Sequence, residues 1–365
     1  MTQKNKIGII IHNDFATKNI PPYPHPIFLS YETPLRIQAI LNHLEEKNVF
    51  TNENIIRIEA ESVDDSIINL AHTSYHINAI KHFSTIGSGL IDDEIFITED
   101  TFELAKKAIG GAIQAITEVI ANSVNQSIAL IRPPGHHALR EKGSGFCIFN
   151  NIANSILYLR HELEYDKRIA IVDIDDHFGD GLVQYFYDDS SVLYFSVHEY
   201  DFVEGELGFI NELGEGEGIG KNINFPIPLK ITDFEFLEFM DILEPVLREF
   251  KPNLIIIAAG FDMYYADPIG NGLLTSLSYY KFAKKMLNIA NDICAGKLAF
   301  ILEGGYSLIG LPVCVNAIIR ALLNEDFKRP SFENMDFSKY SNKNEIAKIK
   351  FSLKKLLAKY RISIR

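Results

Sequence analysis

The sequence predicts an α/β protein in a single domain, built on a mostly parallel eight-stranded sheet with helices on both faces. Two observations carry this prediction. Short apolar runs alternate with stretches of helical periodicity along the 365 residues, and most of these runs are apolar on both faces, as is typical of strands buried on both sides. We find no repeat, low-complexity tract or linker that would divide the chain. A composition with 47% hydrophobic residues can bury a sizeable core.

The expected elements follow one another in βα order along the chain. Eight runs are expected as strands: 7–11, 55–58, 128–131, 169–174, 192–197, 223–227, 254–259 and 298–302. Helices are expected over 101–121, 151–163, 233–250 and 278–295, between several of these strands. In sheets of this kind ligands bind beyond the carboxyl ends of the strands. We therefore expect functional side chains where the apolar runs end.

The net charge of -13 is unevenly distributed. Residues 343–365 carry eight Lys and Arg against the single Glu345, so the tail is basic and the rest of the chain is strongly acidic. An acidic body disfavours nucleic-acid binding and attracts cationic substrates. The tail has apolar residues at helical spacing and is predicted to be an amphipathic helix packed on the domain, with membrane binding as the minor alternative. We expect a catalytic domain over 1–325 and a C-terminal extension over 326–365.

The cysteine content and the amino terminus point to a cytoplasmic protein. The three cysteines, Cys147, Cys294 and Cys314, are few and irregularly spaced, so neither a disulfide framework nor a cysteine zinc cluster is expected. No stretch approaches 18 uninterrupted apolar residues, and the first apolar run is short. We expect no membrane association.

Four apolar runs end in polar clusters. "SIALI" leads to Arg132 and to His136-His137, "RIAIV" to "DIDDHFGDG", "LIIIAAG" to Phe261-Asp262, and "LAFIL" to "EGGY". Each cluster alone would be a weak signal, because such residues often only satisfy turns. Parallel strands end at the same edge of a sheet, so the four clusters together predict one catalytic crevice.

The densest cluster has the residue types of a metal site. Asp173, Asp175 and His177 alternate at period two and project from one face as their strand ends. Asp175, His177 and Asp262 would supply three ligands and leave one position open, the pattern of a catalytic zinc site. Manganese or ferrous iron remains open by ligand type alone.

The motifs RPPGHHA, GFCIFNN, DIDDHFGDG, AGFDMYYADP and EGGY resemble, in this order and spacing, the zinc-dependent histone deacetylase family, including its bacterial deacetylase and acetylpolyamine amidohydrolase branches. The resemblance runs from "IGIIIHNDF" to roughly Arg320. It implies the arginase/deacetylase-like fold and one zinc ion per chain. His25-Pro26 and Arg36 resemble the family's first loop and the arginine beneath its active site.

The resemblance also implies roles for individual residues. Asp175, His177 and Asp262 correspond to the zinc ligands, His136 and His137 to the tandem histidines paired with Asp173 and Asp180, and Tyr306 to the catalytic tyrosine. A structural monovalent cation, usually potassium, is implied near Asp173, Asp175, His177, Ser196 and Val197. Gly145 and Phe146 resemble one wall of the acyl channel, and either Phe202 or Phe209 the other.

These residue types predict amide hydrolysis. Zinc and Tyr306 would polarise an acetamide carbonyl, while His137 would take a proton from water and return one to the leaving amine. His136 would tune charge. An arginase-like two-metal ureohydrolase and a non-catalytic acyl-lysine binder are the alternatives, but DIDDHFGDG does not have the former's ligand spacing and the latter would have little need for Tyr306.

The substrate stays open between acetyl-lysine in peptides or proteins and small acetylated amines. Ile269 stands where relatives that prefer a long acetylpolyamine carry an acidic gatekeeper, whereas Glu94, with Asp92 and Asp93, would give an acidic rim. We therefore expect broad selectivity for acetylated alkylamines. We find no long insertion before "DDEIFITEDTFELA", which favours a monomer or weak oligomer.

Overall fold

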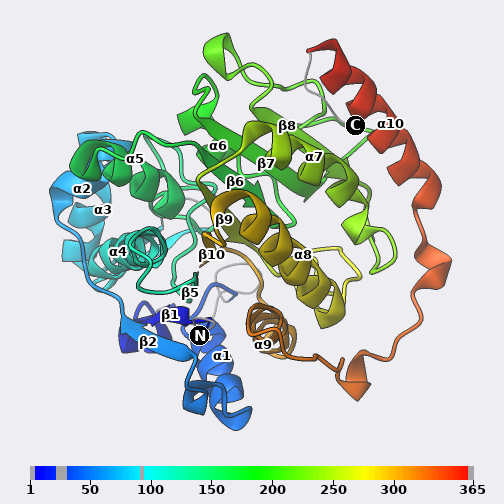
Figure 1. The fold of residues 1–365 in the computed structure, drawn as a ribbon. Helices are drawn as coiled ribbons and strands as arrows, with labels where there is room; N and C mark the ends of the chain where they lie inside the picture. The colour runs from blue at the N-terminus through cyan, green and yellow to red at the C-terminus, as the bar shows by residue number, and fades with distance from the viewer. Residues whose placement is uncertain (1–4, 22–30, 91–93, 361–365) are drawn as a thin grey trace.

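Eight parallel strands form the central sheet of a computed structural model that describes residues 5–21, 31–90 and 94–360, except for the side chain of Ser88 (Figure 1). Their order across the sheet is β2-β1-β5-β10-β9-β6-β7-β8. The strands are β1 (Ile7–Ile11), β2 (Ile55–Glu59), β5 (Gln126–Ala129), β6 (Ile169–Asp173), β7 (Val192–Glu199), β8 (Asn222–Ile227), β9 (Leu254–Ala259) and β10 (Leu298–Leu302).

The predicted fold class is confirmed, and all eight predicted runs are strands of this sheet. The third begins and ends two residues earlier than expected, at Gln126–Ala129. A two-stranded antiparallel hairpin, β3 (Ser88–Leu90) and β4 (Phe96–Thr98), was not predicted. Strands of three residues are too short to show an alternating pattern.

Helices cover both faces of the sheet (Figure 1). On one side lie α2 (Asp65–Ala71), α3 (Ser74–Ile86), α4 (Thr101–Ile120) and α5 (Asn151–Leu163). On the other lie α1 (Leu35–Glu46), α7 (Met240–Phe250), α8 (Ser276–Cys294) and α9 (Gly310–Leu322), while α6 (Asp180–Phe186) follows the active-site end of β6. Three of the four predicted helices match α4, α5 and α8 closely.

The fourth predicted helix, 233–250, forms only in its second half. A short 3-10 turn, Phe236–Phe239, precedes α7. Asp233 instead accepts hydrogen bonds from Thr275 N–H and the Ser278 hydroxyl at the start of α8. A carboxylate in that position satisfies N–H groups that the first turn of a helix leaves without intrahelical partners. This tertiary contact competes with continuing the helix.

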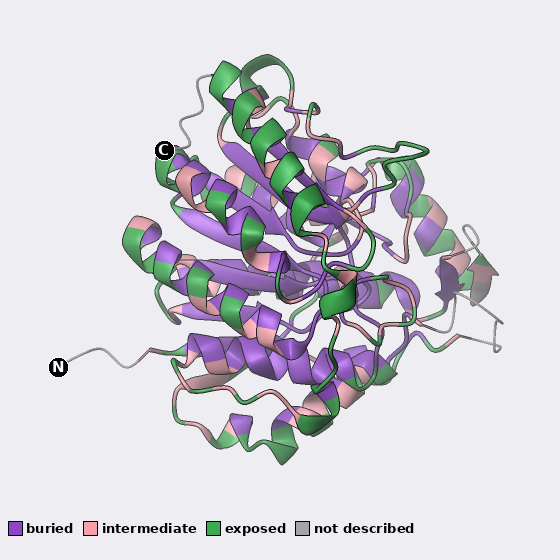
Figure 2. Ribbon diagram, turned by 90° about the vertical axis from the view of Figure 1, so that its right-hand side faces the viewer, coloured by how far each residue is buried: buried purple, intermediate pink, exposed green. Residues whose placement is uncertain are grey.

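Burial follows the layers (Figure 2). Strands β1, β6, β9 and β10 are buried along their whole length, whereas the edge strand β2 is half exposed. This is the pattern expected of a parallel sheet covered on both faces. Among the described residues, no helix has both the length and the apolar character needed to cross a bilayer.

The basic C-terminal segment ends in α10 (Lys343–Lys359), which lies beside β8 (Figure 1). Its apolar stripe, Ile346, Ile349, Leu353 and Leu357, is buried. Lys350 Nζ lies 2.5 Å from a carboxylate oxygen of Glu238 and 2.5 Å from one of Asp241. The basic face of α10 thus forms ion pairs with acidic residues of the rest of the protein. The division of the chain at residue 325 stays a prediction.

Candidate active site

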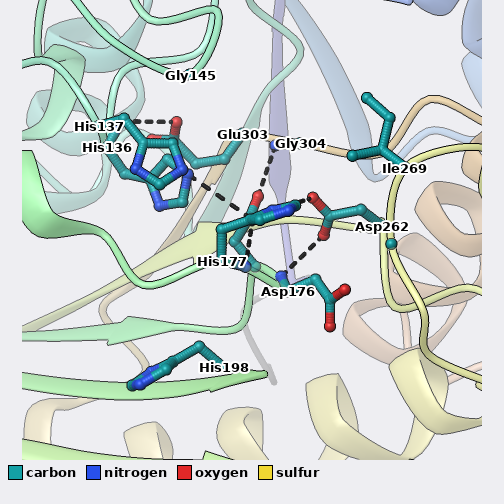
Figure 3. A network of polar contacts seen from close by, with 12 residues as sticks. His136, His137, Gly145, Asp176, His177, His198, Asp262, Ile269, Glu303 and Gly304 are labelled. Carbon is teal, nitrogen blue, oxygen red and sulfur yellow. Dashed lines mark hydrogen bonds and ion pairs between the residues drawn. The ribbon is translucent and has the colours of Figure 1, made fainter. Parts of the chain in front are cut away.

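Four adjacent strands in the middle of the sheet deliver polar side chains to one edge. The segment after β5 carries His136, the segment after β6 carries Asp175, the segment after β9 carries Asp262, and the segment after β10 carries Tyr306. Because β5, β10, β9 and β6 are neighbours, segments distant in sequence meet at the same place (Figure 3).

The three residues proposed as metal ligands converge on one point. The ligand atoms of Asp175, His177 and Asp262 all lie within 4.8 Å of one another. His177 Nδ1 is 3.2 Å from Asp175 Oδ1 and 3.3 Å from Asp262 Oδ2. Asp262 Oδ2 is buried and makes no hydrogen bond within the described part of the chain. Two carboxylates, one imidazole and an orphaned buried oxygen fit a divalent cation.

Two glycines allow the backbone to press against these carboxylates. A Cβ at Gly304 would lie 2.4 Å from Asp262 Oδ2, and a Cβ at Gly260 would lie 2.3 Å from Asp175 Oδ2. The N–H of Gly304 also donates to Asp175 Oδ2 at 2.9 Å. The glycine in "EGGY" therefore both makes room for the ligands and orients one of them.

The protonation of this cluster reflects its crowded negative charge. Burial, followed by the charge of Asp175, raises the pKa of Asp262 to about 7. Burial alone would lower the pKa of His177, but the carboxylates of Asp175 and Asp262 outweigh it and hold the pKa well above its usual range. Metal binding to such a group displaces protons, so its affinity should rise with pH.

The tandem histidines are each paired with a carboxylate. His136 Nδ1 lies 3.2 Å from Asp173 Oδ2, and His137 Nδ1 lies 2.7 Å from Asp180 Oδ1. Burial opposes a charge on His136, but Asp175 and Asp173 raise its pKa to about 10. Burial and the charge of His136 lower the pKa of His137. Near neutral pH the first imidazole carries a charge and the second does not.

Tyr306 lies between an aromatic ring and a buried cation. Its ring centroid is 5.3 Å from that of Phe146 and 4.7 Å from the Arg36 guanidinium carbon. Arg36 is fully buried, and its Nε donates to the Gly305 carbonyl at 2.7 Å. Burial raises the pKa of Tyr306 well above its usual range, so the phenol keeps its proton and can donate a hydrogen bond.

A cavity of about 530 Å³ opens over these groups. Its floor includes the proposed ligands Asp175 and His177. Its walls include the residues His136, His137, Gly145, Phe146, Phe178, Asp180, Ile269 and Tyr306. The proposed acid-base groups therefore face the same space as the proposed metal ligands.

Comparison with known proteins agrees with this arrangement. Residues 30–322 match the model of the histone deacetylase domain. The chain is 35% identical over 321 residues to "Probable deacetylase" of Archaeoglobus fulgidus, covering 87% of each chain. It is also 35% identical to "Histone deacetylase 14, chloroplastic" of Arabidopsis thaliana, over 83% of this chain and 75% of that one. The chain belongs to the histone deacetylase family.

Solved structures are similar to the deacetylase as well. The crystal structure of the HDA15 HD domain matches with a TM-score of 0.78 at 30% identity, covering 89% of this chain and 91% of that one. The deacetylase spans only about half of "Histone deacetylase 18" of Arabidopsis thaliana, with 33% identity and 48% of that protein covered. The family and the hydrolase class predicted from the motifs are confirmed.

The structure does not place either predicted phenylalanine in the second wall of the channel. Phe178, directly after His177, lines the cavity together with Phe146 and Leu207. Phe202 and Phe209 instead pack on Tyr200, with ring centroids 5.0 and 5.1 Å away. Neither ring is among the residues that line the cavity.

The rim of the deacetylase cavity is more acidic than the sequence suggested. Glu94 and Ile269 line it as expected, and Glu94 Oε2 accepts the Gly145 N–H at 3.1 Å. Asp92 and Asp93, also assigned to the rim, lie outside the described residues, as do His25 and Pro26. Glu199 and Glu206 line the cavity too and were not predicted.

The positions proposed for a monovalent cation lie around the ends of two paired strands. Asp173 of β6 is the register partner of Ser196 of β7, next to Val197. Ser196 Oγ is 2.7 Å from His198 Nδ1, and His198 Nε2 is 2.9 Å from the Gly208 carbonyl.

The tautomer of His198 fixes the direction of its hydrogen bond with Ser196. A carbonyl only accepts, so His198 Nε2 carries the hydrogen and Nδ1 accepts from the Ser196 hydroxyl. Burial lowers the pKa of His198 to about 3, which keeps the ring neutral. The Ser196 hydroxyl therefore donates to His198, and the same side chain also interacts with the Tyr194 hydroxyl.

For two further residues near the site, Asp176 and Glu303, no role was predicted from the sequence. Asp176 is buried and contacts two segments of the site. Its N–H donates to Asp262 Oδ1 at 2.9 Å, and its Oδ2 accepts the Asn271 N–H at 3.1 Å. Glu303 Oε2 accepts the N–H groups of Gly135 and His136 at 2.6 and 3.1 Å. Both residues lie in the predicted polar clusters, Asp176 in "DIDDHFGDG" and Glu303 in "EGGY", but no role was predicted for either.

His72 and His76 contact the backbone of the segment that follows His137. His72 Nδ1 contacts the Leu139 carbonyl at 2.9 Å, and its Nε2 accepts the Asn150 N–H at 2.8 Å. His76 Nε2 contacts the Ile148 carbonyl at 2.8 Å. Their spacing of four residues therefore serves backbone hydrogen bonds that brace the segment between His137 and α5.

Proposed function

We propose that this deacetylase uses one zinc ion to hydrolyse the acetamide of an acetylated primary amine, giving acetate and the free amine. The observation that carries the proposal is the convergence of three side chains that could hold a metal, two of which line the same cavity as a neutral histidine and a protonated tyrosine. Acetyl-lysine in a peptide is the first candidate substrate. Small acetylated amines are the second.

Asp175, His177 and Asp262 would hold the ion. Zinc at such a site acts as a Lewis acid toward a carbonyl and acidifies water. The three ligands come from two strand ends, and both carboxylates are fixed by backbone N–H donors, from Gly304 to Asp175 and from Asp176 to Asp262. This orientation by neighbouring groups supports a site that is formed before the metal binds.

His137 is the proposed general base. Its Nδ1 faces the Asp180 carboxylate, which only accepts, so Nδ1 carries the hydrogen and Nε2 keeps a free lone pair. In the proposed reaction Nε2 removes a proton from the water that attacks the carbonyl, and the same nitrogen then returns a proton to the leaving amine as the C–N bond breaks. One water is consumed and no other reactant is needed.

Tyr306 and His136 are the proposed stabilising groups. The Tyr306 phenol can donate to the carbonyl oxygen as negative charge develops there. His136, charged by its carboxylate neighbours, adds positive charge beside His137 without acting as a base. The two rings lie with centroids 4.1 Å apart, so the charge of His136 disfavours a second charge on His137.

The acidic wall favours substrates with a distal cation. Glu94, Glu199 and Glu206 line the cavity, and they would attract an ammonium group beyond the acetamide. An acetyl-lysine in a basic peptide meets this condition, and so does a short acetylated diamine. Ile269 adds no acidic gatekeeper that would require one long polyamine.

We also propose a potassium ion bound partly by backbone carbonyls at Asp173, Asp175, His177, Ser196 and Val197. The strand register supports it, because Asp173 of β6 lies opposite Ser196 of β7. A monomer or weak oligomer in the cytoplasm, with the catalytic domain over 1–325, stays a prediction.

The test is a side-by-side assay of the zinc-loaded protein. Acetate release should be seen from acetyl-lysine peptides and from acetylated diamines, with kcat/KM falling as salt rises for cationic substrates. Glu199→Gln and Glu206→Gln should lower the ratio of kcat/KM for cationic substrates to kcat/KM for neutral substrates. Release of acetate from none of these substrates would refute the proposed function, and turnover of one long polyamine alone would refute the broad selectivity.

A further inference from the structure

The carboxylate of Asp267 joins two segments that line the cavity. Its Oδ1 accepts hydrogen bonds from the N–H groups of Ile269 and Gly270 at 3.0 and 3.4 Å. Its Oδ2 accepts from the N–H groups of Tyr306 and Ser307 at 2.6 and 2.9 Å. One side chain therefore connects the loop after β9, which carries Ile269, to the segment after β10, which carries Tyr306.

The loop after β9 is itself anchored to the proposed metal site. A Cβ at Gly270 would lie 2.1 Å from the Asp262 carbonyl oxygen, so the loop backbone packs directly on a proposed ligand. The Asn271 N–H donates to Asp176 Oδ2 at 3.1 Å, and Asn271 Nδ2 donates to Glu199 Oε1 at 3.1 Å. Asp267 thus connects the tyrosine segment to a fixed reference point.

The other contacts of Tyr306 hold its ring, and Arg36 Nε also donates to the carbonyl of the preceding residue, Gly305, at 2.7 Å. Arg36 and Phe146 lie against the ring, and packing of this kind tolerates sliding. The hydrogen bond from Tyr306 N–H to Asp267 Oδ2 has a fixed direction and is short. The peptide group between Gly305 and Tyr306 is therefore held at its carbonyl by Arg36 and at its N–H by Asp267, and the contact with Asp267 ties it to the loop after β9.

We propose that Asp267 is a positioning residue that sets the distance between the Tyr306 hydroxyl and the proposed metal ligands. This inference rests on the proposed function, in which Tyr306 donates to the carbonyl oxygen. A carboxylate offers acceptors on both oxygens and no donor, which matches four N–H groups. An amide at the same place would turn a donor toward one of the two N–H pairs.

Amide hydrogen exchange tests the contact itself. In Asp267→Asn, exchange should speed up in the peptides that contain Ile269 and Gly270 or Tyr306 and Ser307, and should stay unchanged in peptides from the opposite edge of the sheet. The control is Asp189→Asn, because Asp189 Oδ1 accepts the Ser191 N–H at 2.7 Å in the turn before β7, at the other end of the strands. Unchanged exchange at the four N–H groups would contradict the inference.

Kinetics then separate positioning from general stability. Asp267→Asn should lower kcat by about 10- to 100-fold with little change in KM or zinc content, the loss typical of a displaced catalytic group. Asp267→Glu keeps the charge but shifts the pivot, so it should give an intermediate kcat. In the Tyr306→Phe background, Asp267→Asn should cost less than about threefold more, because it acts through the missing hydroxyl.

The outcomes are distinguishable. Absence of turnover by the wild-type protein would refute the proposed function. Wild-type turnover with an unchanged kcat in Asp267→Asn would refute only the positioning role. A full additional loss in the Tyr306→Phe background would also refute it, because independent effects multiply.

Discussion

His137 and Asp180 make the shorter of the two histidine-carboxylate contacts, with 2.7 Å between Nδ1 and Oδ1 against 3.2 Å between His136 and Asp173. The shorter pair includes the histidine whose pKa is lowered, and the longer pair includes the one whose pKa is raised to about 10. Burial and the neighbouring charge of His136 therefore differentiate two adjacent residues of the same type. This asymmetry supports the proposal that His137 is the general base.

The first prediction concerns that assignment. His137→Ala should lower kcat by about 10²- to 10⁴-fold, because a general base contributes that much. Asp180→Asn should also lower kcat, since an amide can donate to Nδ1 and so stabilise the wrong tautomer. Steady-state acetate release measures both, and metal analysis checks that zinc is retained. Near-normal turnover by His137→Ala would reassign the base.

Tyr306→Phe should remove transition-state stabilisation and leave binding intact. We expect kcat to fall by about 10²- to 10³-fold, the loss typical of one oxyanion donor, with zinc content unchanged. Phe keeps the ring contacts with Phe146 and Arg36, so the variant isolates the hydroxyl. A change confined to KM would mean that the hydroxyl only binds the ground state.

Most of the fold was predictable because the strands are short, apolar and buried on both faces. The site was predictable for the same reason, since four polar clusters at the carboxyl ends of those strands have only one edge to share. The contacts that were missed all depend on the distance between segments remote in sequence. The carboxylate of Asp267, for example, accepts the Tyr306 N–H, although the two residues follow different strands of the sheet.

The channel wall shows a second limit of sequence reasoning. Phe178 lies inside the motif that supplies His177, and no role in the channel was predicted for it. Phe202 and Phe209 offered two aromatic rings in a loop whose conformation depends on the contact with Tyr200. Sequence patterns alone do not determine the direction of side chains in such a loop.

His72 should make folding sensitive to mild acid. Burial and the nearby His76 lower its pKa from 6.5 to about 3, so the unfolded chain takes up a proton near pH 6.5 that the folded chain refuses until about pH 3. The contribution of His72 to the free energy of unfolding is therefore fully present above pH 6.5 and is lost as the pH falls toward 3. Between pH 7 and pH 5 this one residue should cost about 2 kcal/mol of unfolding free energy.

The measurement is urea unfolding of the wild type and of His72→Gln at both pH values. The variant should be less stable at pH 7, because the bonds to Leu139 and Asn150 are weakened, but its loss between pH 7 and pH 5 should be about 2 kcal/mol smaller. His82→Gln, at an exposed position of α3, is the matched control. Equal pH dependence in all three proteins would refute the linkage.

The C-terminal extension should stabilise the domain through Glu333. Its carboxylate is fully buried and accepts from the Ser276 hydroxyl at 2.6 Å and from the Ser276 N–H at 3.3 Å, at the start of α8. Glu333→Ala leaves both donors unpaired and should cost about 1–3 kcal/mol of unfolding free energy. Glu345→Ala, at an exposed surface pair with Lys348, should cost less than about 1 kcal/mol. Similar losses in the two variants would argue against a specific cap.

The most direct test of the account is a zinc titration of the metal-free protein, followed by both metal content and acetate release. We expect one zinc per chain, with acetate release that rises in proportion to bound zinc and stops rising at one equivalent. Asp262→Asn should lose both the bound zinc and the acetate release. Two transition ions per chain, or acetate release by the metal-free protein, would contradict it.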